Sequence, residues 1–409
     1  MKFPAQPIYK LKGVIRNYDW GGYEFIPQLL SQNNPEKKPV AEYWLGAHAS
    51  ASSRLLMDGD EILLEKFIAL QPELLLGKNT AKKFHRLPFL LKVLDVRDML
   101  SIQVHPSKYE AEKGFARENK EGISIDAPHR NYKDDNHKPE LMVALSEFWL
   151  LHGFKPADEL SELLSTVAEF RSLHEIFSAT GYDQLYKTVM EMPQQSVNEL
   201  LKPLLERIIS QYQQGQFSKS QPDYWAAKAA LSFTLANNID RGIFSIYFLN
   251  LIHLKKGEGI FQDAGVLHAY LEGQNVEIMA SSDNVLRGGL TTKHIDVKEL
   301  MKHVKFEETR PAIIHGQNIS SKEIHYPTGA PDFKLSRLVL NRGEECRIQT
   351  NSAEIILVLQ GEAKLSSKQA ELKLAKGGSA FLKADEEILI SATAEADMIR
   401  ASVPVHTSE

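Results

Sequence analysis

The stretch LSIQVHP (residues 100–106) alternates apolar and polar residues and ends at a proline. Such alternation predicts a β-strand, in which successive side chains point to opposite faces. Gln103 and His105 would then share one face, with Ile102 and Val104 on the other, and the proline would end the strand or confine it to a sheet edge. Both polar side chains can bind a metal ion. A lone histidine is more often a hydrogen-bonded structural group, so this interpretation needs partners elsewhere in the chain.

Two other segments supply such partners. NHKPE (residues 136–140) places Glu140 after a proline that fixes the backbone, and LHAY (residues 267–270) contains His268. Together with Gln103 and His105 they offer one amide, two imidazoles and one carboxylate. Zinc accepts such nitrogen and oxygen ligands, and the lack of a cysteine ligand argues against a closed structural zinc site. Two histidines and one carboxylate also describe a non-heme iron triad, so both metals stay open on the ligands alone.

Positive charge accompanies the proposed ligands. In a strand, Lys138 and Glu140 would share a face, which places an ammonium beside a metal ligand, where it can bind a phosphate or move a proton. The alternative is an ordinary surface salt bridge. Farther along, Arg287 precedes two glycines that allow close approach of a ligand, and Lys293 follows. Both can attract an anionic substrate, whereas the alternative is a solvated loop with a charged rim.

The distribution of apolar residues predicts a mainly β protein with a helical insertion. Short apolar runs broken by Gly and Pro indicate strands before residue 155, and leucines at helical spacing follow them. The run FSIYFLNLI (residues 244–252) predicts a return to strands, arranged as sandwich or jelly-roll units. We expect a catalytic jelly-roll domain in two parts, a helical domain between them and a C-terminal β domain: residues 1–154 and 241–320, 155–240, and 321–409.

A faint internal repeat supports two jelly-roll units in tandem. Lys256-Gly257 recurs 120 residues later as Lys376-Gly377, and a following Phe-x-x-Ala recurs with it. Both copies are typical of a turn followed by a strand. His268 corresponds to Ile388 in the second copy. We therefore expect the C-terminal unit to have no metal site.

Composition narrows the class of protein and its location. The net charge is -5 and the pI about 6.3, which is unlike a nucleic-acid-binding protein. The single cysteine, Cys346, fits a reducing compartment. Since no run approaches 18 apolar residues, no membrane span is expected. We expect a cytoplasmic protein without nucleic-acid or membrane partners.

The chain resembles the type I mannose-6-phosphate isomerase (phosphomannose isomerase) family in six motifs that occur in family order. The motifs are NYDWG (17–21), AEYWLGAH (41–48), PFLLKVL (88–94), LSIQVHP (100–106), NYKDDNHKPE (131–140) and SDNVLRGGLTTK (282–293). Small departures are Leu267 and Thr292, where the family often has Pro, and Gly289, where it often has Ala. None of them removes a ligand or a charge, so we expect activity to survive.

The resemblance implies an enzyme that binds one zinc ion per chain and interconverts mannose 6-phosphate and fructose 6-phosphate through an enediol. It implies a cupin-type jelly-roll catalytic domain, an all-helical domain and a second cupin-like domain, and we expect a monomer. The family's zinc ligands correspond to Gln103, His105, Glu140 and His268, and its active-site arginine to Arg287. Residues expected to line the site are Trp20, Glu42, Ser101, Lys138, Tyr270, Asp283 and Lys293.

The sequence leaves two assignments open. A base must move a proton between C2 and C1, and the candidates are a zinc-bound water, Asp283, Lys138 and His137. The phosphate is expected near Ser101, Lys138, Arg287 and Lys293.

Two other functions compete with the isomerase. A cupin oxygenase would use iron and consume oxygen, but an iron triad needs no amide such as Gln103. A non-catalytic sugar-phosphate-binding cupin would be expected to have lost ligands or charges, and here all are present. A bifunctional isomerase–nucleotidyltransferase is set aside because the N-terminal half contains no separate Gly-rich nucleotide domain.

Overall fold

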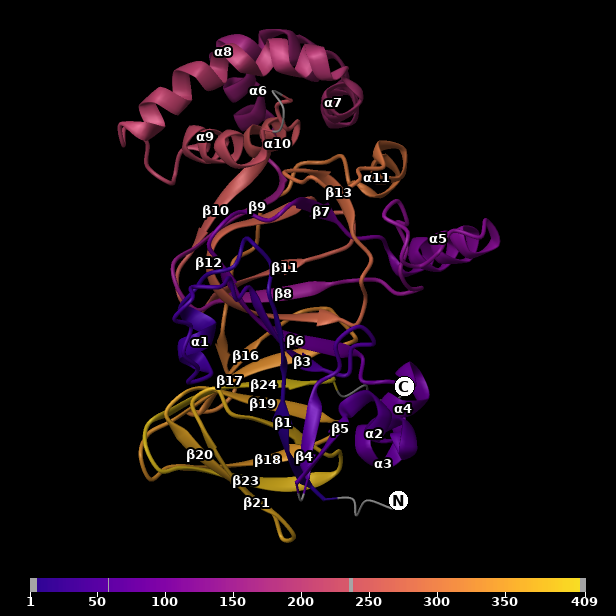
Figure 1. The fold of residues 1–409 in the computed structure, drawn as a ribbon, viewed down its shortest axis with the longest axis vertical. Helices are drawn as coiled ribbons and strands as arrows, with labels where there is room; N and C mark the ends of the chain where they lie inside the picture. The colour runs from indigo at the N-terminus through magenta and orange to yellow at the C-terminus, as the bar shows by residue number, and fades with distance from the viewer. Residues whose placement is uncertain (1–5, 58, 235–237, 405–409) are drawn as a thin grey trace.

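The structure is a computed structural model that describes residues 6–57, 59–234 and 238–404. Within these residues the chain forms a helical block at one end, an 11-stranded sheet in the middle, and a sandwich of a 9-stranded and a 4-stranded sheet at the other end (Figure 1). The expected mainly β architecture with a helical insertion is confirmed. No helix in the described part of the chain has the length and apolar character needed to cross a membrane.

The central jelly roll is organised around β12 (His268–Ala280). The second half of this strand pairs with β6 (Phe89–Val96) and β8 (Glu140–Ala144), and the first half with β9 (Phe148–Phe154) and β7 (Ile102–Val104). Gly273, at a φ of +132°, lies where the partners change. A Cβ there would lie 2.6 Å from the backbone oxygen of Glu147, so the bend needs glycine. The other strands of this system are β2 (Val14–Arg16), β3 (Glu42–Gly46), β10 (Leu249–Leu254), β11 (Glu258–Gln262), β13 (Leu286–Gly289) and β14 (Ile314–His315).

The C-terminal sandwich takes strands from both ends of the chain. β1 (Ile8–Lys12) lies between β22 (Ser379–Leu382) and β4 (Arg54–Met57), which in turn pairs with β5 (Asp60–Leu63). The remaining strands of the larger sheet are β15 (Gln317–Asn318), β16 (Glu323–Tyr326), β17 (Lys334–Leu340), β19 (Glu354–Gln360) and β24 (Ala396–Ser402). The smaller sheet consists of β18 (Glu345–Thr350), β20 (Glu362–Ser366), β21 (Glu371–Ala375) and β23 (Glu386–Ala392). The N-terminal segment thus contributes to both β units, and the domain boundaries stay a prediction.

The helical block follows the predicted helical segment but ends later than expected. It contains α6 (Ala157–Thr166), η1 (Ala168–Phe170), α7 (Arg171–Glu191), α8 (Gln194–Gln213), α9 (Pro222–Phe233) and α10 (Gly242–Phe248). The strand predicted at residues 244–252 is therefore wrong over its first half, because the chain is helical to Phe248 and β10 begins at Leu249. All seven residues of α10 are buried. A short run of mostly apolar residues is found in buried helices and in buried strands, so the sequence pattern does not distinguish the two.

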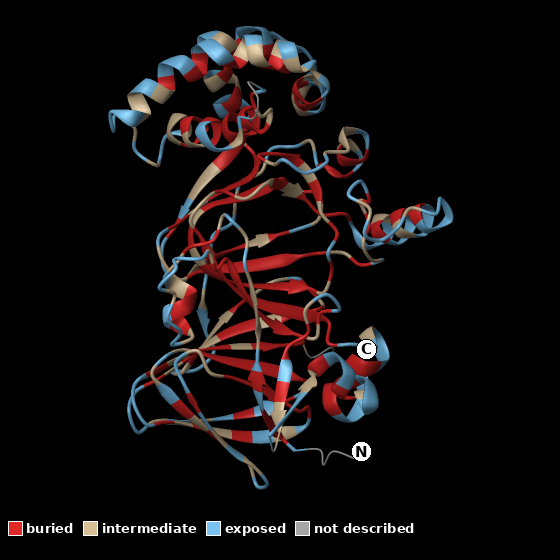
Figure 2. Ribbon diagram, viewed as in Figure 1, coloured by how far each residue is buried: buried red, intermediate tan, exposed pale blue. Residues whose placement is uncertain are grey.

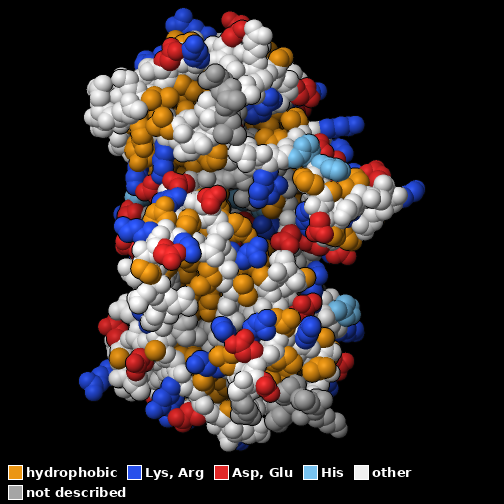
Figure 3. Space-filling view, viewed as in Figure 1, with side chains coloured by type: hydrophobic (Ala, Val, Ile, Leu, Met, Phe, Trp, Pro, Cys, Tyr) orange, Lys and Arg blue, Asp and Glu red, His pale blue; other side chains and the backbone are white. Residues whose placement is uncertain are grey.

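Further helices lie beside the β units. They are α1 (Phe25–Leu29), α2 (Leu64–Leu70), α3 (Pro72–Leu76), α4 (Lys78–Phe84), α5 (Lys108–Lys120) and α11 (Val297–His303). Figure 2 shows buried residues along the strands and on the inner faces of the helices, with exposed residues on the outer helix faces. On the face drawn in Figure 3, acidic and basic side chains are interspersed, as the mixed composition suggests.

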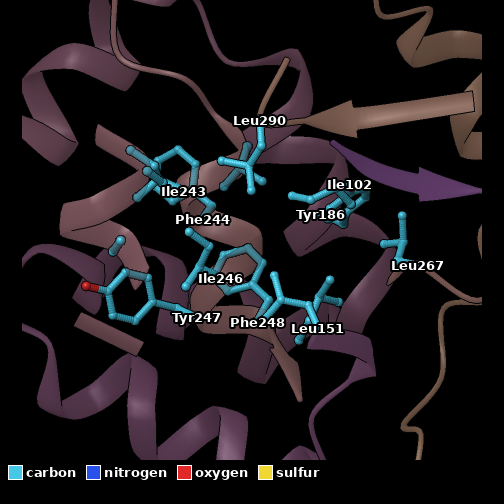
Figure 4. Close-up of a cluster of buried hydrophobic side chains, with 14 of the residues drawn as sticks. Ile102, Leu151, Tyr186, Ile243, Phe244, Ile246, Tyr247, Phe248, Leu267 and Leu290 are labelled. Atoms are coloured by element: carbon cyan, nitrogen blue, oxygen red, sulfur yellow. The ribbon is translucent and has the colours of Figure 1, made fainter. Parts of the chain in front are cut away.

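One face of β7, β12 and β13 packs against the helical block. Ile102 on β7 and Leu267 just before β12 join Phe244 and Phe248 of α10 in one hydrophobic cluster (Figure 4). Because side chains alternate along a strand, the residues next to these apolar ones point to the interior of the jelly roll. The hydrophobic interface with the helices therefore fixes which polar side chains face inward.

Candidate metal centre

Four strands place their polar residues side by side. Gln103 of β7 pairs with His268 of β12 and with Arg287 of β13, and His268 also pairs with His152 of β9. Residues directly opposite each other in antiparallel strands point to the same face. The four side chains therefore form a row on the inner face, opposite the apolar interface with the helices.

His105, Glu140 and His268 form a buried cluster. Each residue is at most 4% exposed, and one ligand atom from each lies within 4.8 Å of the others. His105 Nε2 and His268 Nε2 are each 3.4 Å from a different oxygen of Glu140. Ligand atoms about 2.1 Å from a tetrahedral zinc ion lie about 3.4 Å apart. The spacing of these atoms thus matches the coordination shell of one zinc ion.

Backbone carbonyls orient both imidazoles. The Nδ1 atom of His105 lies 2.8 Å from the carbonyl oxygen of Asn284, and that of His268 lies 2.9 Å from the carbonyl oxygen of Val266. Donation from Nδ1 leaves each Nε2 free to bind metal. Among the described residues, no group hydrogen-bonds to the buried Nε2 of His105, and this is costly unless the atom binds a metal ion. Burial, opposed by the charge of Glu140, lowers the pKa of His105 to about 4, so the imidazole is neutral near pH 7.

Lys138 lies beside the carboxylate of Glu140. Its Nζ atom is 3.1 Å from Glu140 Oε1, and both side chains are less than a tenth exposed, so this is not a surface salt bridge. Burial alone would raise the pKa of Glu140. The positive charge of Lys138 opposes this effect and holds that pKa well below its usual range. Glu140 is therefore an anionic candidate ligand, and the cation of Lys138 lies beside Oε1, the same oxygen that faces His105.

A second buried polar group lies on the same inner face of the jelly roll. Lys92 Nζ is 2.9 Å from Glu277, and the hydroxyl of Tyr270 donates to the other oxygen of that carboxylate at 2.8 Å. Trp44 Nε1 donates to the buried Glu42. Burial would lower the pKa of Lys92, but Glu277, Glu42 and Glu140 raise it well above its usual range, so the ammonium stays charged.

Sequence reasoning did not single out several of these interior residues. Lys92 and Glu277 are single charges inside apolar strand runs, and this pattern is the signal that could have found them. Gln262 lies opposite Glu140 in the pairing of β11 with β8. Both Gln262 and Asn275 are 0% exposed, and their side-chain amides have no hydrogen-bond partner among the described residues. Isolated amides in a sequence carry no comparable signal.

Arg287 and Lys293 form a cationic pair at the edge of the site. Arg287 is half-buried and Lys293 is exposed. Burial lowers the pKa of Arg287, and burial together with the charge of Arg287 lowers that of Lys293. Within the described part of the chain neither residue forms an ion pair, and the charge of Arg287 acts on Lys293. Such an arrangement is suited to bind a phosphate.

The structure directs two of the predicted site residues elsewhere. His137 directly precedes Lys138, and its side chain is directed away from the cluster: its Nε2 atom lies 2.8 Å from the buried carboxylate of Asp332. Asp283 is exposed, and its Oδ1 atom lies 3.5 Å from Nε2 of His48.

The remaining predicted residues surround the cluster. Tyr270 and Glu42 lie in the interior, as described above, whereas Trp20 stacks on Tyr18 with ring centroids 5.7 Å apart and also packs against the interior hydrophobic residues. Ser101 is half-buried directly before β7. Gln103, His105, Glu140, His268 and Lys138 are thus brought together, while the roles of all these residues stay predictions.

A jelly roll that presents two histidines and a glutamate to its interior defines the class of cupin-type mononuclear metal proteins. Comparisons with known proteins narrow this class. The family model "Phosphomannose isomerase type I, catalytic domain" matches residues 8–157, and "Mannose-6-phosphate isomerase, cupin domain" matches residues 322–401. The chain belongs to the type I phosphomannose isomerase family.

Relatives match the chain over nearly its whole length. The mannose-6-phosphate isomerase of Escherichia coli (strain K12) is 38% identical over 385 residues, covering 93% of this chain and 95% of that protein. The Homo sapiens mannose-6-phosphate isomerase is 32% identical and covers 97% of this chain and 98% of its own length. A crystal structure of the Salmonella typhimurium enzyme bound to substrate (f6p) and zinc has a TM-score of 0.86 and 35% identity, with 98% of this chain and 100% of that chain covered.

Proposed function

We propose that this chain is a zinc-dependent aldose–ketose isomerase that interconverts mannose 6-phosphate and fructose 6-phosphate. The observation that carries the proposal is the buried His105–Glu140–His268 cluster inside a jelly roll of this family. Gln103, in register with His268, supplies the fourth ligand for one zinc ion. Bound zinc would polarise the sugar oxygens and stabilise the negative charge that develops on them.

The reaction requires a balanced movement of protons. C2 of the open-chain aldose loses a proton and O1 gains one, which gives an enediol. C1 then gains a proton and O2 loses one, which gives the ketose. The protein must therefore bind an open chain, supply a base and an acid near C1 and C2, and stabilise charge on two neighbouring oxygens.

The interior residues can hold the sugar hydroxyls. Lys138 and Lys92 are buried cations, and Tyr270 is a phenol whose pKa is raised well above its usual value by burial and by Glu277, so it stays protonated. Ammonium and phenol groups donate hydrogen bonds to hydroxyl and enediol oxygens. We infer that these groups orient the carbon chain beside the metal.

Arg287 and Lys293 have separate positions relative to the ligands. Arg287 lies opposite Gln103 in the strand register, so its side chain starts on the same face as the metal ligands, and we infer that its guanidinium stabilises the enediol charge. Lys293 is exposed, which suits it to receive the phosphate at the mouth of the site. We propose this division of roles, with Ser101 close to the phosphate.

Among the side chains considered as the base, Lys138 lies nearest the cluster, because its Nζ atom contacts Glu140. It acts as the base only from its neutral amine, whereas as the ammonium it is the acid that returns a proton. Asp283 and His137 instead have His48 and Asp332 as neighbours. A Lys138→Ala variant that still binds fructose 6-phosphate should lose exchange of the C1 proton with deuterated solvent. Asp283→Asn and His137→Asn variants provide the comparison, and loss of exchange in one of these alone would move the assignment.

The proposal is tested with a coupled assay that follows fructose 6-phosphate formed from mannose 6-phosphate. Activity should disappear on chelation and return on addition of zinc. No activity in any condition, or oxygen consumption with iron in its place, would overturn the proposal.

We further propose that the protein is a cytoplasmic monomer. The lone Cys346 supports a reducing compartment, because no intrachain disulfide can form. Light scattering on the purified chain tests the oligomeric state, and a dimer mass would contradict the proposal.

A further inference from the structure

A cavity of about 220 Å³ lies where the central jelly roll meets the C-terminal sandwich. Its lining comes from α1, the end of β8, the turn before β11, and strands β16, β17, β19 and β24. Figure 1 shows α1 at the left, level with β16 and β17. The lining contains none of the residues assigned to the metal centre, so the isomerase site does not account for this cavity.

The cavity has apolar walls and one neutralised polar pair. The apolar side chains are Phe25, Leu29, Val143, Leu145, Leu359 and Ile399. Arg337 donates to both oxygens of Asp397 at 2.7 Å, so their charges cancel within the wall. An organic group of modest size would lose contact with water here and gain apolar contacts.

Two further cations in the lining come from the internal repeat. Lys256 and Lys376 each precede a glycine with positive φ, +90° at Gly257 and +78° at Gly377. Each glycine N–H donates at 2.8 Å to a strand carbonyl of its own β unit, at Ala144 and Val358 respectively. The two turns are therefore structurally equivalent, and they bring one lysine from each β unit to the same cavity.

Neither lysine is neutralised by the protein. Among the residues that the structure describes, the ammonium groups of Lys256 and Lys376 form no ion pair and no hydrogen bond, and both side chains are exposed. Because the charges of Arg337 and Asp397 cancel each other, the lining has two uncompensated positive charges, those of Lys256 and Lys376. An apolar cavity with two free cations is complementary to an anion that has an apolar body.

We propose that this cavity is a binding site for a small organic anion, with its apolar body against the Phe25 and Leu359 walls and its acid group paired with Lys256 and Lys376. The proposal does not depend on the isomerase function. Because the walls belong to both β units, a bound ligand links them and stabilises the folded chain by mass action.

Calorimetric titration of the full, zinc-loaded chain with 3-phenylpropionate tests the proposal. Saturating fructose 6-phosphate is present throughout, so that the probe cannot report on the isomerase site. One probe molecule per chain should bind. 3-Phenylpropanol, which lacks the charge, and acetate, which lacks the ring, should each bind about tenfold more weakly or worse.

Matched variants locate the binding. K256Q/K376Q should raise the dissociation constant of 3-phenylpropionate about tenfold while leaving the melting temperature of the free chain unchanged. K255Q/K373Q is the control. It removes two exposed lysines that lie close to Lys256 and Lys376 in the sequence but do not line the cavity, so the dissociation constant should stay unchanged. Absence of probe binding, or equal weakening by the two double variants, would overturn the proposal.

Discussion

Replacement of Asn284 by alanine should weaken both the fold and the metal centre. Asn284 is fully buried, and its side chain accepts a hydrogen bond from the N–H of Lys133 at 2.7 Å. It also donates to the carbonyls of Asp134 and Asn136, each at 2.8 Å. The residue thus joins the loop before β13 to the segment that leads to Lys138. Its own carbonyl accepts from His105 Nδ1, so the same residue orients a zinc ligand.

The structure gives the size of the effect. Three buried hydrogen bonds at about 1 kcal/mol each predict a loss of about 3 kcal/mol in the free energy of unfolding of N284A. N284A keeps the backbone carbonyl that accepts from His105, but it removes the side-chain hydrogen bonds that hold the loop carrying this carbonyl in place. Displacement of a group that orients a ligating histidine typically weakens metal binding about 10- to 100-fold. Urea unfolding of the zinc-free chain measures the first quantity, and competition with a chromogenic chelator measures the second.

A surface substitution provides the control. Asn341 is exposed, so N341A should change the free energy of unfolding by less than about 0.5 kcal/mol and leave zinc affinity unchanged. If N284A lost stability as predicted but bound zinc as tightly as the unmodified chain, the loop would not orient His105, and the reasoning would be refuted.

Three further predictions follow from the site and its surroundings. Gln103→Ala should weaken zinc binding about tenfold by chelator competition, because a neutral amide is the weakest of the four ligands; undiminished affinity would remove Gln103 from the set. Lys293→Ala should raise KM for mannose 6-phosphate about fivefold with little change in kcat, and the exposed Lys298→Ala serves as its control. Burial would raise the pKa of Glu299, but the nearby His303 and the hydrogen bonds from Lys302, Tyr132 and Arg117 hold it below its usual range. The stabilisation from Glu299 is therefore present above about pH 4 and is lost as pH falls. E299Q should therefore lower Tm at pH 7, and the difference from the unmodified chain should shrink below pH 4; a pH-independent difference would contradict this.

Alternation along single strands could be predicted from the sequence because it is a local property. In LSIQVHP the apolar residues pack against the helices and Gln103 faces inward, as the pattern predicts. The jelly-roll architecture followed from the short apolar runs and the family motifs.

Features that depend on distant partners could not be predicted in the same way. The run at residues 244–252 is mostly apolar, and only its packing against α9 and its neighbours decides that the first part is helical. His137 is directed to Asp332, nearly 200 residues away, and β1 joins the C-terminal sheet through pairing with β22. Such contacts depend on tertiary register, which no local pattern encodes.

The pairing of Lys92 with Glu277 also depends on tertiary register, so it could not be predicted from the sequence. Each residue is a lone charge in its own strand, and burial would be costly for either one alone. Only the register of β12 against β6, which sets the two residues opposite each other, turns them into a compensated buried pair. The motif PFLLKVL contains Lys92, but Glu277 lies outside all six motifs, and nothing local in either strand reveals that the two residues meet.

The central claim is that Gln103, His105, Glu140 and His268, which come from β7, the residue just after it, β8 and β12, bind one zinc ion. Crystals of the zinc-loaded chain, with diffraction recorded on either side of the zinc absorption edge, test it most directly. The account predicts one anomalous peak about 2.0–2.2 Å from His105 Nε2, His268 Nε2, a Glu140 oxygen and the Gln103 amide oxygen. A peak bound by other residues, or no peak at this cluster, would contradict it.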